Sequence, residues 1–216
     1  MIEVSRVTVK VLQTIHDMAQ VVFRHTYRDI LSPEQMEYMM DMMYSLPNLQ
    51  KQLDEGHHYY IAYIHENAAV YETIVEGSVS AAEDTTVCEA VVEESESAAE
   101  DAVGEYVPCG YVSVQHEGQD GDGTEIFHLH KIYVMPQFQG RGVGIRLFET
   151  AVRHVRTTLQ TLTDHKTTKA RMELNVNKYN TAVNFYKHLG MRILLEEDFP
   201  IGNGFYKTDY VMGLDI

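Results

Sequence analysis

Three glycines at alternate positions of the segment QFQGRGVGIRLF, residues 137–148, are the first feature with chemical meaning. Glycine destabilises a helix by about 1 kcal/mol relative to alanine, yet Gly140, Gly142 and Gly144 stand at the start of an amphipathic helical pattern. The first turn of a helix presents unpaired backbone N–H groups and the positive end of the helix dipole. Glycines let an anion such as a diphosphate approach these groups, and Arg141 adds positive charge. The segment therefore predicts an anion-binding site.

Two common phosphate-binding loops do not fit this glycine pattern. A dinucleotide-binding fingerprint needs glycines at offsets 0, 2 and 5, but Ile145 and Leu147 stand five residues after Gly140 and Gly142. A P-loop needs Gly-Lys followed by Ser or Thr, and this segment does not contain that sequence. The pattern therefore belongs to a different kind of phosphate-binding loop.

Hydrophobic periodicity predicts the elements that position this loop. Ser32 is a candidate N-cap, with Pro33 at the first helical position and Gln35 reaching back as in a loose capping box. The order of elements describes a mixed α/β sheet. Strands are predicted over 3–11, 57–65, 106–115, 125–135, 170–177, 191–199 and 205–216, and helices over 12–30, 33–44, 47–53, 142–159 and 181–190.

The composition indicates a globular chain whose acidity belongs to one region. The 216 residues are 44% apolar and carry a formal net charge of −15, and this length suits one well-buried core. More than half of the 32 acidic residues lie within 52–130, which contains no lysine or arginine and argues against nucleic acid as a partner of that face. No segment approaches a membrane-spanning length, and the first 25 residues do not resemble a secretory leader. We therefore expect a single domain over 1–216, in the cytoplasm, without a membrane or nucleic-acid partner.

Residues 67–105 differ in kind from the rest of the chain. They are rich in Glu, Ser and Ala, contain no basic residue and show weak periodicity. We expect an acidic low-complexity insertion between two strands of the domain. A solvated loop is the favoured interpretation, and an electrostatic rim that attracts cationic acceptors is the alternative.

The cysteines and histidines do not suggest a metal site. Cys88 and Cys109 could form only one pair, and neither has a partner at metal-ligand spacing. Most of the eleven histidines are scattered, apart from the pairs at 57–58 and 128–130. We expect reduced thiols and no bound metal.

Two motifs in the second half of the chain resemble the GNAT superfamily of acetyl-CoA-dependent N-acetyltransferases. Gln139-x-x-Gly142-x-Gly144 follows the strand HKIYVMP, as the central motif of the superfamily follows a strand ending in Val-x-Pro. The segment NVNKYNTAVNFYKHLGMR is similar to the closing motif of the superfamily, with Met191 in place of the common Phe. The resemblance is specific from Tyr111 to Leu195, weaker over residues 1–66 and absent from the insertion.

The resemblance implies a fold and a cofactor site. The fold would be a mixed, mostly antiparallel sheet of six to seven strands with helices on both faces, splayed where the pantetheine arm of acetyl-CoA enters. Backbone groups of the strand before the loop would bind that arm, the glycine loop would bind the diphosphate, and one N–H would polarise the thioester carbonyl. By similarity, the cofactor contacts are Ile132, Tyr133, Val134, Gln139, Gly140, Arg141, Gly142, Val143, Gly144, Asn175, Asn180 and Tyr186.

The resemblance also implies proton-transfer groups. An alkyl ammonium acceptor titrates near 10.4, so a base or a water chain must remove a proton before attack. His128 and His130 share a strand face, and HLH at this distance before the loop is similar to the paired histidines of arylalkylamine N-acetyltransferases. We expect His128 as the leading base and His130 as the second, with a water chain alone as the alternative. Tyr186 is the candidate general acid for the departing thiolate.

The acceptor is less well defined than the cofactor. The N-terminal region is weakly similar to bacterial polyamine N-acetyltransferases, which favours a small cationic primary amine attacked directly in a ternary complex. Tyr27, Tyr38 and Tyr44 could line its pocket, whereas the methionines of 36–43 are expected in the core. Asp29 and Asp209 are candidate acidic groups near the cleft. Acetylation of a protein N-terminus or lysine, or a non-catalytic acetyl-CoA-binding module, stays open, as does a homodimer.

Overall fold

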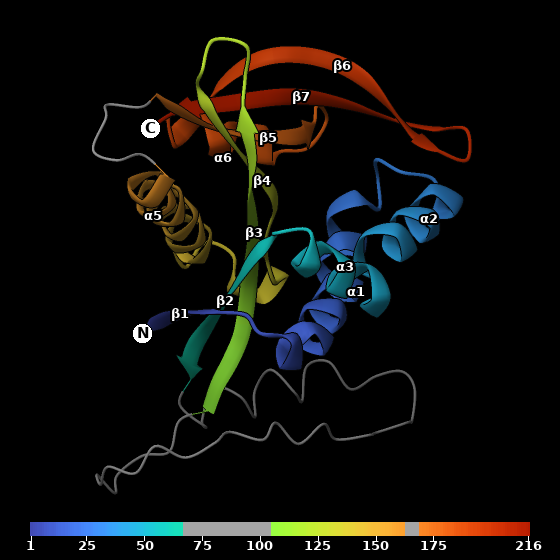
Figure 1. Cartoon of the computed structure of the whole chain (residues 1–216). Helices are drawn as coiled ribbons and strands as arrows, with labels where there is room; N and C mark the ends of the chain where they lie inside the picture. Colours follow the sequence, from blue (N-terminus) through green and yellow to red (C-terminus); the bar gives the residue numbers. More distant parts are fainter. Residues whose placement is uncertain (67–104, 163–168) are drawn as a thin grey trace, which may run out of the picture. The chain divides into compact units, whose positions relative to one another are not determined.

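The structure is a computed structural model, and it describes residues 1–66, 105–162 and 169–216 (Figure 1). The predicted acidic insertion therefore lies outside the described residues except for Glu105, the first residue of β3. The elements are β1 (Ile2–Arg6), α1 (Leu12–Tyr27), α2 (Pro33–Tyr44), α3 (Leu46–Asp54), β2 (His58–Glu66), β3 (Glu105–Gln119), β4 (Glu125–Val134), α5 (Val143–Leu162), β5 (Ala170–Asn177), α6 (Ala182–His188), β6 (Arg192–Gly202) and β7 (Phe205–Asp215), with 3-10 turns at Val9–Val11 and Pro136–Phe138.

The chain divides into two compact units. One unit comprises Ile2–Tyr63 and Pro108–Ile216, and it contains every feature of the site that follows. The other comprises Met1 and Ile64–Val107. Within its described part, the amide of His65 donates to the carbonyl oxygen of Met1 at 3.2 Å.

The strands form a seven-stranded sheet in the order β1-β2-β3-β4-β5-β7-β6. The pairs β3–β4, β5–β7 and β6–β7 are antiparallel, and β4–β5 is parallel. Helices α1 and α5 both pack against β4, and Figure 1 shows them on opposite sides of that strand. The predicted mixed, mostly antiparallel sheet with helices on both faces is confirmed.

The parallel pairing of β4 with β5 is short. It runs from Glu125 opposite Ala170 to His128 opposite Glu173, although β4 continues to Val134. On their other edges β4 stays paired with β3 as far as Val134, and β5 stays paired with β7 as far as Asn177. The two strands therefore diverge in their second halves, as predicted, and the facing edges of both are left without a strand partner.

Three local predictions are corrected by the structure. The predicted strand 3–11 ends at Arg6, because Val9–Val11 form a 3-10 turn that leads directly into α1. The helix predicted to reach residue 30 ends at Tyr27. Ser32 is the N-cap of α2, as predicted, with Gln35 N donating to its side-chain oxygen at 3.2 Å. However, the side chain of Gln35 donates instead to the carbonyl oxygen of Tyr206 at 2.8 Å.

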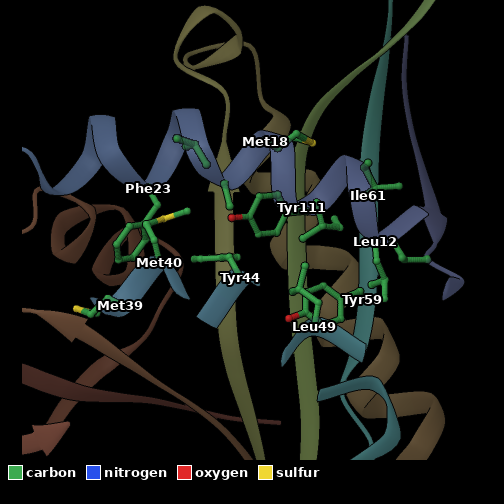
Figure 2. Close-up of a cluster of buried hydrophobic side chains, with 14 of the residues drawn as sticks. Leu12, Met18, Phe23, Met39, Met40, Tyr44, Leu49, Tyr59, Ile61 and Tyr111 are labelled. Atoms are coloured by element: carbon green, nitrogen blue, oxygen red, sulfur yellow. The ribbon is translucent and has the colours of Figure 1, made fainter. Parts of the chain in front are cut away.

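A hydrophobic cluster fixes α1, α2 and α3 against β2 and β3 (Figure 2). Phe23, Leu49 and Tyr44 are at most 1% exposed within it. The methionines of α2 belong to this core, as predicted, since Met36, Met39 and Met40 are buried and Met43 is partly buried. Burial of each such side chain contributes about 1.5–3 kcal/mol to folding. Tyr44 is therefore a core residue, and the prediction that it lines a substrate pocket is wrong.

Close packing of β3 on β4 yields a test of this fold. A Cβ atom on Gly110 would lie 2.7 Å from the carbonyl oxygen of Tyr133 and 3.0 Å from Leu147 Cδ1. We expect Gly110→Ala to destabilise the protein by about 1–3 kcal/mol through overpacking. Denaturant unfolding measures the change. The matched control is Gly121→Ala, because a Cβ there meets nothing within 4 Å, and its unfolding free energy should change by no more than about 0.5 kcal/mol. Equal effects of the two substitutions would contradict this packing.

Candidate active site

A cavity of about 820 Å³ opens where β4 and β5 diverge. Its walls come from the second halves of both strands, the glycine loop, the first turn of α5, the start of α6 and the C-terminal part of α1. The residues predicted to form the site that line this cavity are His130, Ile132, Tyr133, Val134, Gln139, Gly140, Gly142, Val143, Gly144, Asn175, Asn180 and Tyr186.

Two of the predicted residues are not part of the cavity wall. The guanidinium of Arg141 lies over the ring of Phe138, 5.4 Å from its centroid. The ring of His128 lies behind that of His130, with 4.6 Å between the ring centroids. The sequence thus identified most of the residues that line the cavity, but it did not predict that the side chains of Arg141 and His128 lie outside the cavity wall.

Two different structural reasons explain why glycine stands at these three positions of the loop. Gly140 and Gly142 adopt φ values of 75° and 84°, which residues with a Cβ atom rarely adopt, and nothing lies within 4 Å of where a Cβ would be. At Gly144 a Cβ would lie 3.2 Å from Phe185 Cζ, so this glycine lets α6 approach α5. The first two glycines therefore leave open space beside the backbone, and the third serves helix packing.

The start of α5 supplies hydrogen-bond donors to this open space. The helix begins at Val143, and the amide of Arg146 donates to the carbonyl oxygen of Gly142 at 3.1 Å. The preceding amides of the first turn have no acceptor within the helix, and Val143, Gly144 and Ile145 all line the cavity. The arrangement suits an anion such as a diphosphate.

Asn180 and Tyr186 line the cavity from the start of α6 and from within it. The side-chain oxygen of Asn180 accepts a hydrogen bond from the amide of Ala182 at 2.9 Å, so this residue forms an Asx turn directly before α6. Tyr186 is buried at 7% exposure, and burial followed by the neighbouring Tyr27 raises the pKa of its hydroxyl. That hydroxyl is therefore protonated at neutral pH and can donate a proton.

Tyr27 of α1 brings the N-terminal half of the chain to the site. It lines the cavity, and the side chains of Tyr133 and Asn180 both interact with its hydroxyl, whose pKa is raised mainly by burial. Asp209 of β7 also acts on this hydroxyl. Of the tyrosines predicted to line an acceptor pocket, Tyr27 lines this cavity. Tyr38 instead donates to the carbonyl oxygen of Ile201 at 2.8 Å.

A β-bulge in β4 lies beside the cavity, next to a cluster of polar side chains that includes His57, His128, His130 and Lys131. Ser113 and Val114 of β3 lie opposite Lys131 and Leu129 of β4, which makes His130 an extra residue in β4. Leu129 before it is buried in the core, and the rings of His57 and His128 lie close to that of His130. The ring centroids of His57 and His130 are 4.2 Å apart.

Burial keeps the three histidines of this cluster neutral. It lowers the pKa of His57 and of His128 to about 4 and that of His130 to about 2. The positive charges of Lys131 and Lys207 add to the effect on His128. At neutral pH these rings therefore carry a free lone pair, and their lowered pKa makes them weaker bases than an ordinary imidazole.

Lys131 is a buried amine without a carboxylate neighbour among its described contacts. Its Nζ donates to Gln52 Oε1 at 2.6 Å and lies 5.5 Å and 5.7 Å from the ring centroids of Tyr59 and Tyr44. Burial, with a smaller contribution from Lys207, lowers its pKa to about 7. Sequence reasoning missed both Lys131 and His57, because only the folded chain shows that they lie beside the histidine pair.

The remaining sequence expectations concern metals, membranes and thiols. In the part of the chain that the structure describes, no group of three or more His, Cys, Asp or Glu residues is arranged to hold a metal ion. None of the described helices is long and apolar enough to span a membrane. Cys109 is buried and its thiol donates to the carbonyl oxygen of Ala62 at 3.3 Å, whereas Cys88 lies outside the described residues.

Comparison with known protein families gives a match over part of the chain. Residues 91–192 match the family model of the acetyltransferase (GNAT) domain. No curated protein matches the chain.

Solved structures with low sequence identity share the fold. The PaiA N-acetyltransferase of Thermoplasma acidophilum, solved in complex with coenzyme A, is 15% identical, covers 99% of this chain and 98% of its own, and has a TM-score of 0.60. A GCN5-related N-acetyltransferase of Rhodopseudomonas palustris is 14% identical, with 99% and 95% covered and a TM-score of 0.61. The ribosomal-protein-S18-alanine N-acetyltransferase of Escherichia coli is 13% identical, with 100% and 94% covered and a TM-score of 0.52.

The buried amine predicts a pH dependence of stability. Because the pKa of Lys131 is lowered in the folded state, from 10.5 to about 7, the unfolded chain binds more protons between these values. We therefore expect the unfolding free energy of the wild type, relative to Lys131→Met, to rise with pH from 7 towards 10. The slope is at most about 1.4 kcal/mol per pH unit. Denaturant unfolding at pH 7, 8 and 9 measures it.

An exposed lysine provides the control for this prediction. Lys51 has a side-chain exposure of 68%, and Lys51→Met should give a stability curve parallel to that of the wild type. A parallel curve for Lys131→Met as well would show that Lys131 is not held neutral.

Proposed function

We propose that this chain is an acetyl-CoA-dependent acyltransferase of the GNAT superfamily that acetylates a small cationic primary amine such as a polyamine. The amine would attack the thioester directly, with both substrates bound. The observation that carries the proposal is the cavity between β4 and β5, because the glycine loop and the predicted proton-transfer groups lie on its walls.

The residues around the cavity fit the cosubstrate. Open space beside Gly140 and Gly142 and the first-turn amides of α5 suit the diphosphate. The unpaired edge of β4 beside Ile132 and Val134 suits an extended pantetheine arm. When bound there, acetyl-CoA supplies the activated acetyl group, and holding an amine next to it provides effective molarities of about 10⁵ M or more.

Acidic groups support a cationic acceptor. Asp29 lines the cavity at the C-terminal end of α1. Asp209 is buried at 3% exposure, interacts with the hydroxyl of Tyr27 and pairs with Lys207 Nζ at 3.2 Å. A buried carboxylate next to a tyrosine hydroxyl attracts an ammonium group. A homodimer, a cytoplasmic location and a single domain over 1–216 stay predictions from the sequence.

We assign the protons as follows. His130, the histidine of the pair that lines the cavity, receives the proton of the acceptor ammonium, and His128 behind it is second, which reverses the predicted order. Tyr186 returns a proton to the thiolate of coenzyme A. Its raised pKa supports this role, because a neutral phenol keeps its proton until a strong base such as the thiolate develops beside it.

A panel of amines tests the function directly. We expect thiol release from acetyl-CoA to be fastest with spermidine or spermine, because their spaced ammonium groups suit the acidic residues near Tyr27. The panel also includes phenethylamine and short peptides with a free N-terminus. Faster turnover of a peptide than of any polyamine would contradict the proposed acceptor and favour N-terminal acetylation. Binding of acetyl-CoA without turnover of any amine would indicate a non-catalytic module.

The role of Tyr186 has its own test. Tyr186→Phe keeps the ring in the core and removes only the hydroxyl, so kcat should fall about 10²-fold or more while the melting temperature stays close to that of the wild type. An undiminished kcat would remove Tyr186 from the mechanism. Tyr179→Phe is the matched control, because Tyr179 also lines the cavity but its side chain is 70% exposed.

A further inference from the structure

We propose that Glu117 is the group through which the proton leaves the active site, because its carboxylate joins the two histidines of β4 to the solvent. The inference rests on the proposed function of His130 and extends it to a residue of β3. Nothing in the motifs around the glycine loop points to Glu117.

A second β-bulge places Glu117 in this position. His116 and Gly118 of β3 lie opposite Phe127 and Ile126 of β4, so Glu117 is an extra residue that has no partner in the register. The other bulge inserts His130 into β4. The two inserted residues belong to neighbouring strands, and their side chains meet.

Glu117, His128 and His130 form a branched chain of polar groups. Glu117 Oε1 lies 3.8 Å from His130 Nε2, and Glu117 Oε2 lies 3.9 Å from His128 Nδ1. Each carboxylate oxygen thus faces a different histidine. The side chains of His130 and His128 are 24% and 17% exposed, whereas that of Glu117 is 42% exposed. A proton that reaches Glu117 has therefore reached the surface.

Gln115 determines which nitrogen of His130 can accept a proton. The amide nitrogen of Gln115 donates to the carbonyl oxygen of Glu55 at 2.7 Å, so its Oε1 must face His130. His130 Nε2 lies 2.9 Å from that Oε1 and therefore carries a hydrogen. The free lone pair of the ring is then on Nδ1. Gln115 is a positioning residue in this scheme.

The proton transfers balance as follows. The acceptor ammonium gives one proton to His130 Nδ1, and the resulting imidazolium gives the proton on Nε2 to Glu117, directly after a small ring movement or through one water. Glu117 releases it to solvent. The neutral amine then forms the N–C bond as the C–S bond breaks, and its second proton passes by way of Tyr186 to the thiolate. The sum is one acetamide, one thiol and one released proton.

The charged surroundings favour transit of the proton towards Glu117. Facing the cluster are His57 before β2, Lys131 of β4, Glu173 of β5 and Lys207 of β7. The positive groups disfavour a lasting charge on the histidines. Burial, followed by Glu173, raises the pKa of Glu117, which makes it a better proton acceptor than an ordinary glutamate.

The test compares carboxylate variants with spermidine as the amine, between pH 6 and 9. Glu117→Gln keeps the shape of the side chain but cannot take up a proton as a carboxylate, and we expect kcat/KM to fall at least about tenfold. Added formate should restore part of the activity of Glu117→Ala. Glu196→Gln is the matched control, since this carboxylate of β6 is 52% exposed and bound to Lys178 Nζ at 3.1 Å, and its rate should stay within about twofold of the wild type. Slow hydrolysis of acetyl-CoA, in which water must also lose a proton, provides a second readout that needs no amine.

The outcomes separate this inference from the proposed function. A rate for Glu117→Gln within twofold of the wild type, or an equal loss in Glu196→Gln, would overturn the role of Glu117. If His130→Ala is slow while Glu117→Gln is not, the base stands and the exit through Glu117 fails. If the single variants of His128 and His130 and Glu117→Gln all keep the wild-type rate and pH profile, the proposed base fails as well. Melting temperatures confirm that each variant is folded.

Discussion

The site depends on backbone hydrogen-bonding groups that β4 and β5 leave without a strand partner. Parallel pairing stops at His128 and Glu173, and from there the facing edges line a cavity. Unpaired buried backbone groups destabilise a fold by an amount comparable to a lost hydrogen bond, so such an edge needs another partner. In the proposed complex an extended pantetheine arm supplies one. The diphosphate would then lie at the glycine loop, because β4 leads to this loop and to the first turn of α5.

Proton chemistry follows from the same strand. The bulge at His130 lies beside the cavity, next to the buried Leu129. Burial keeps the histidines of this strand neutral, so their rings offer a free lone pair, whereas Tyr186, which also lines the cavity, keeps its proton. In the proposed mechanism the histidines are therefore the proton acceptors and Tyr186 is the proton donor.

The sequence predicted the features of the site that depend on local residue types, but not those that depend on how distant segments pack. Gly140 and Gly142 predicted the loop because glycines at a helix start leave backbone N–H groups open to an anion, and the structure adds positive φ angles at both. The predictions of a splayed sheet and of cofactor contacts by Asn180 and Tyr186 came from the resemblance to a known superfamily. In contrast, Lys131 lies beside the histidines through long-range packing and Glu117 through a β-bulge, and neither feature leaves a pattern in the sequence. The same limit explains the error at Tyr44, since a tyrosine at helical spacing is compatible with a pocket or a core.

The most direct measurement of the central claim is calorimetric titration of acetyl-CoA into the purified chain and into Gly142→Val. Gly142 has a φ of 84°, which a β-branched residue strongly disfavours, and a Cβ there would project into the space that the diphosphate needs. The account predicts one acetyl-CoA per chain with the wild type and an affinity at least about tenfold weaker with Gly142→Val. No heat of binding to the wild type, or equal affinity for both proteins, would contradict it.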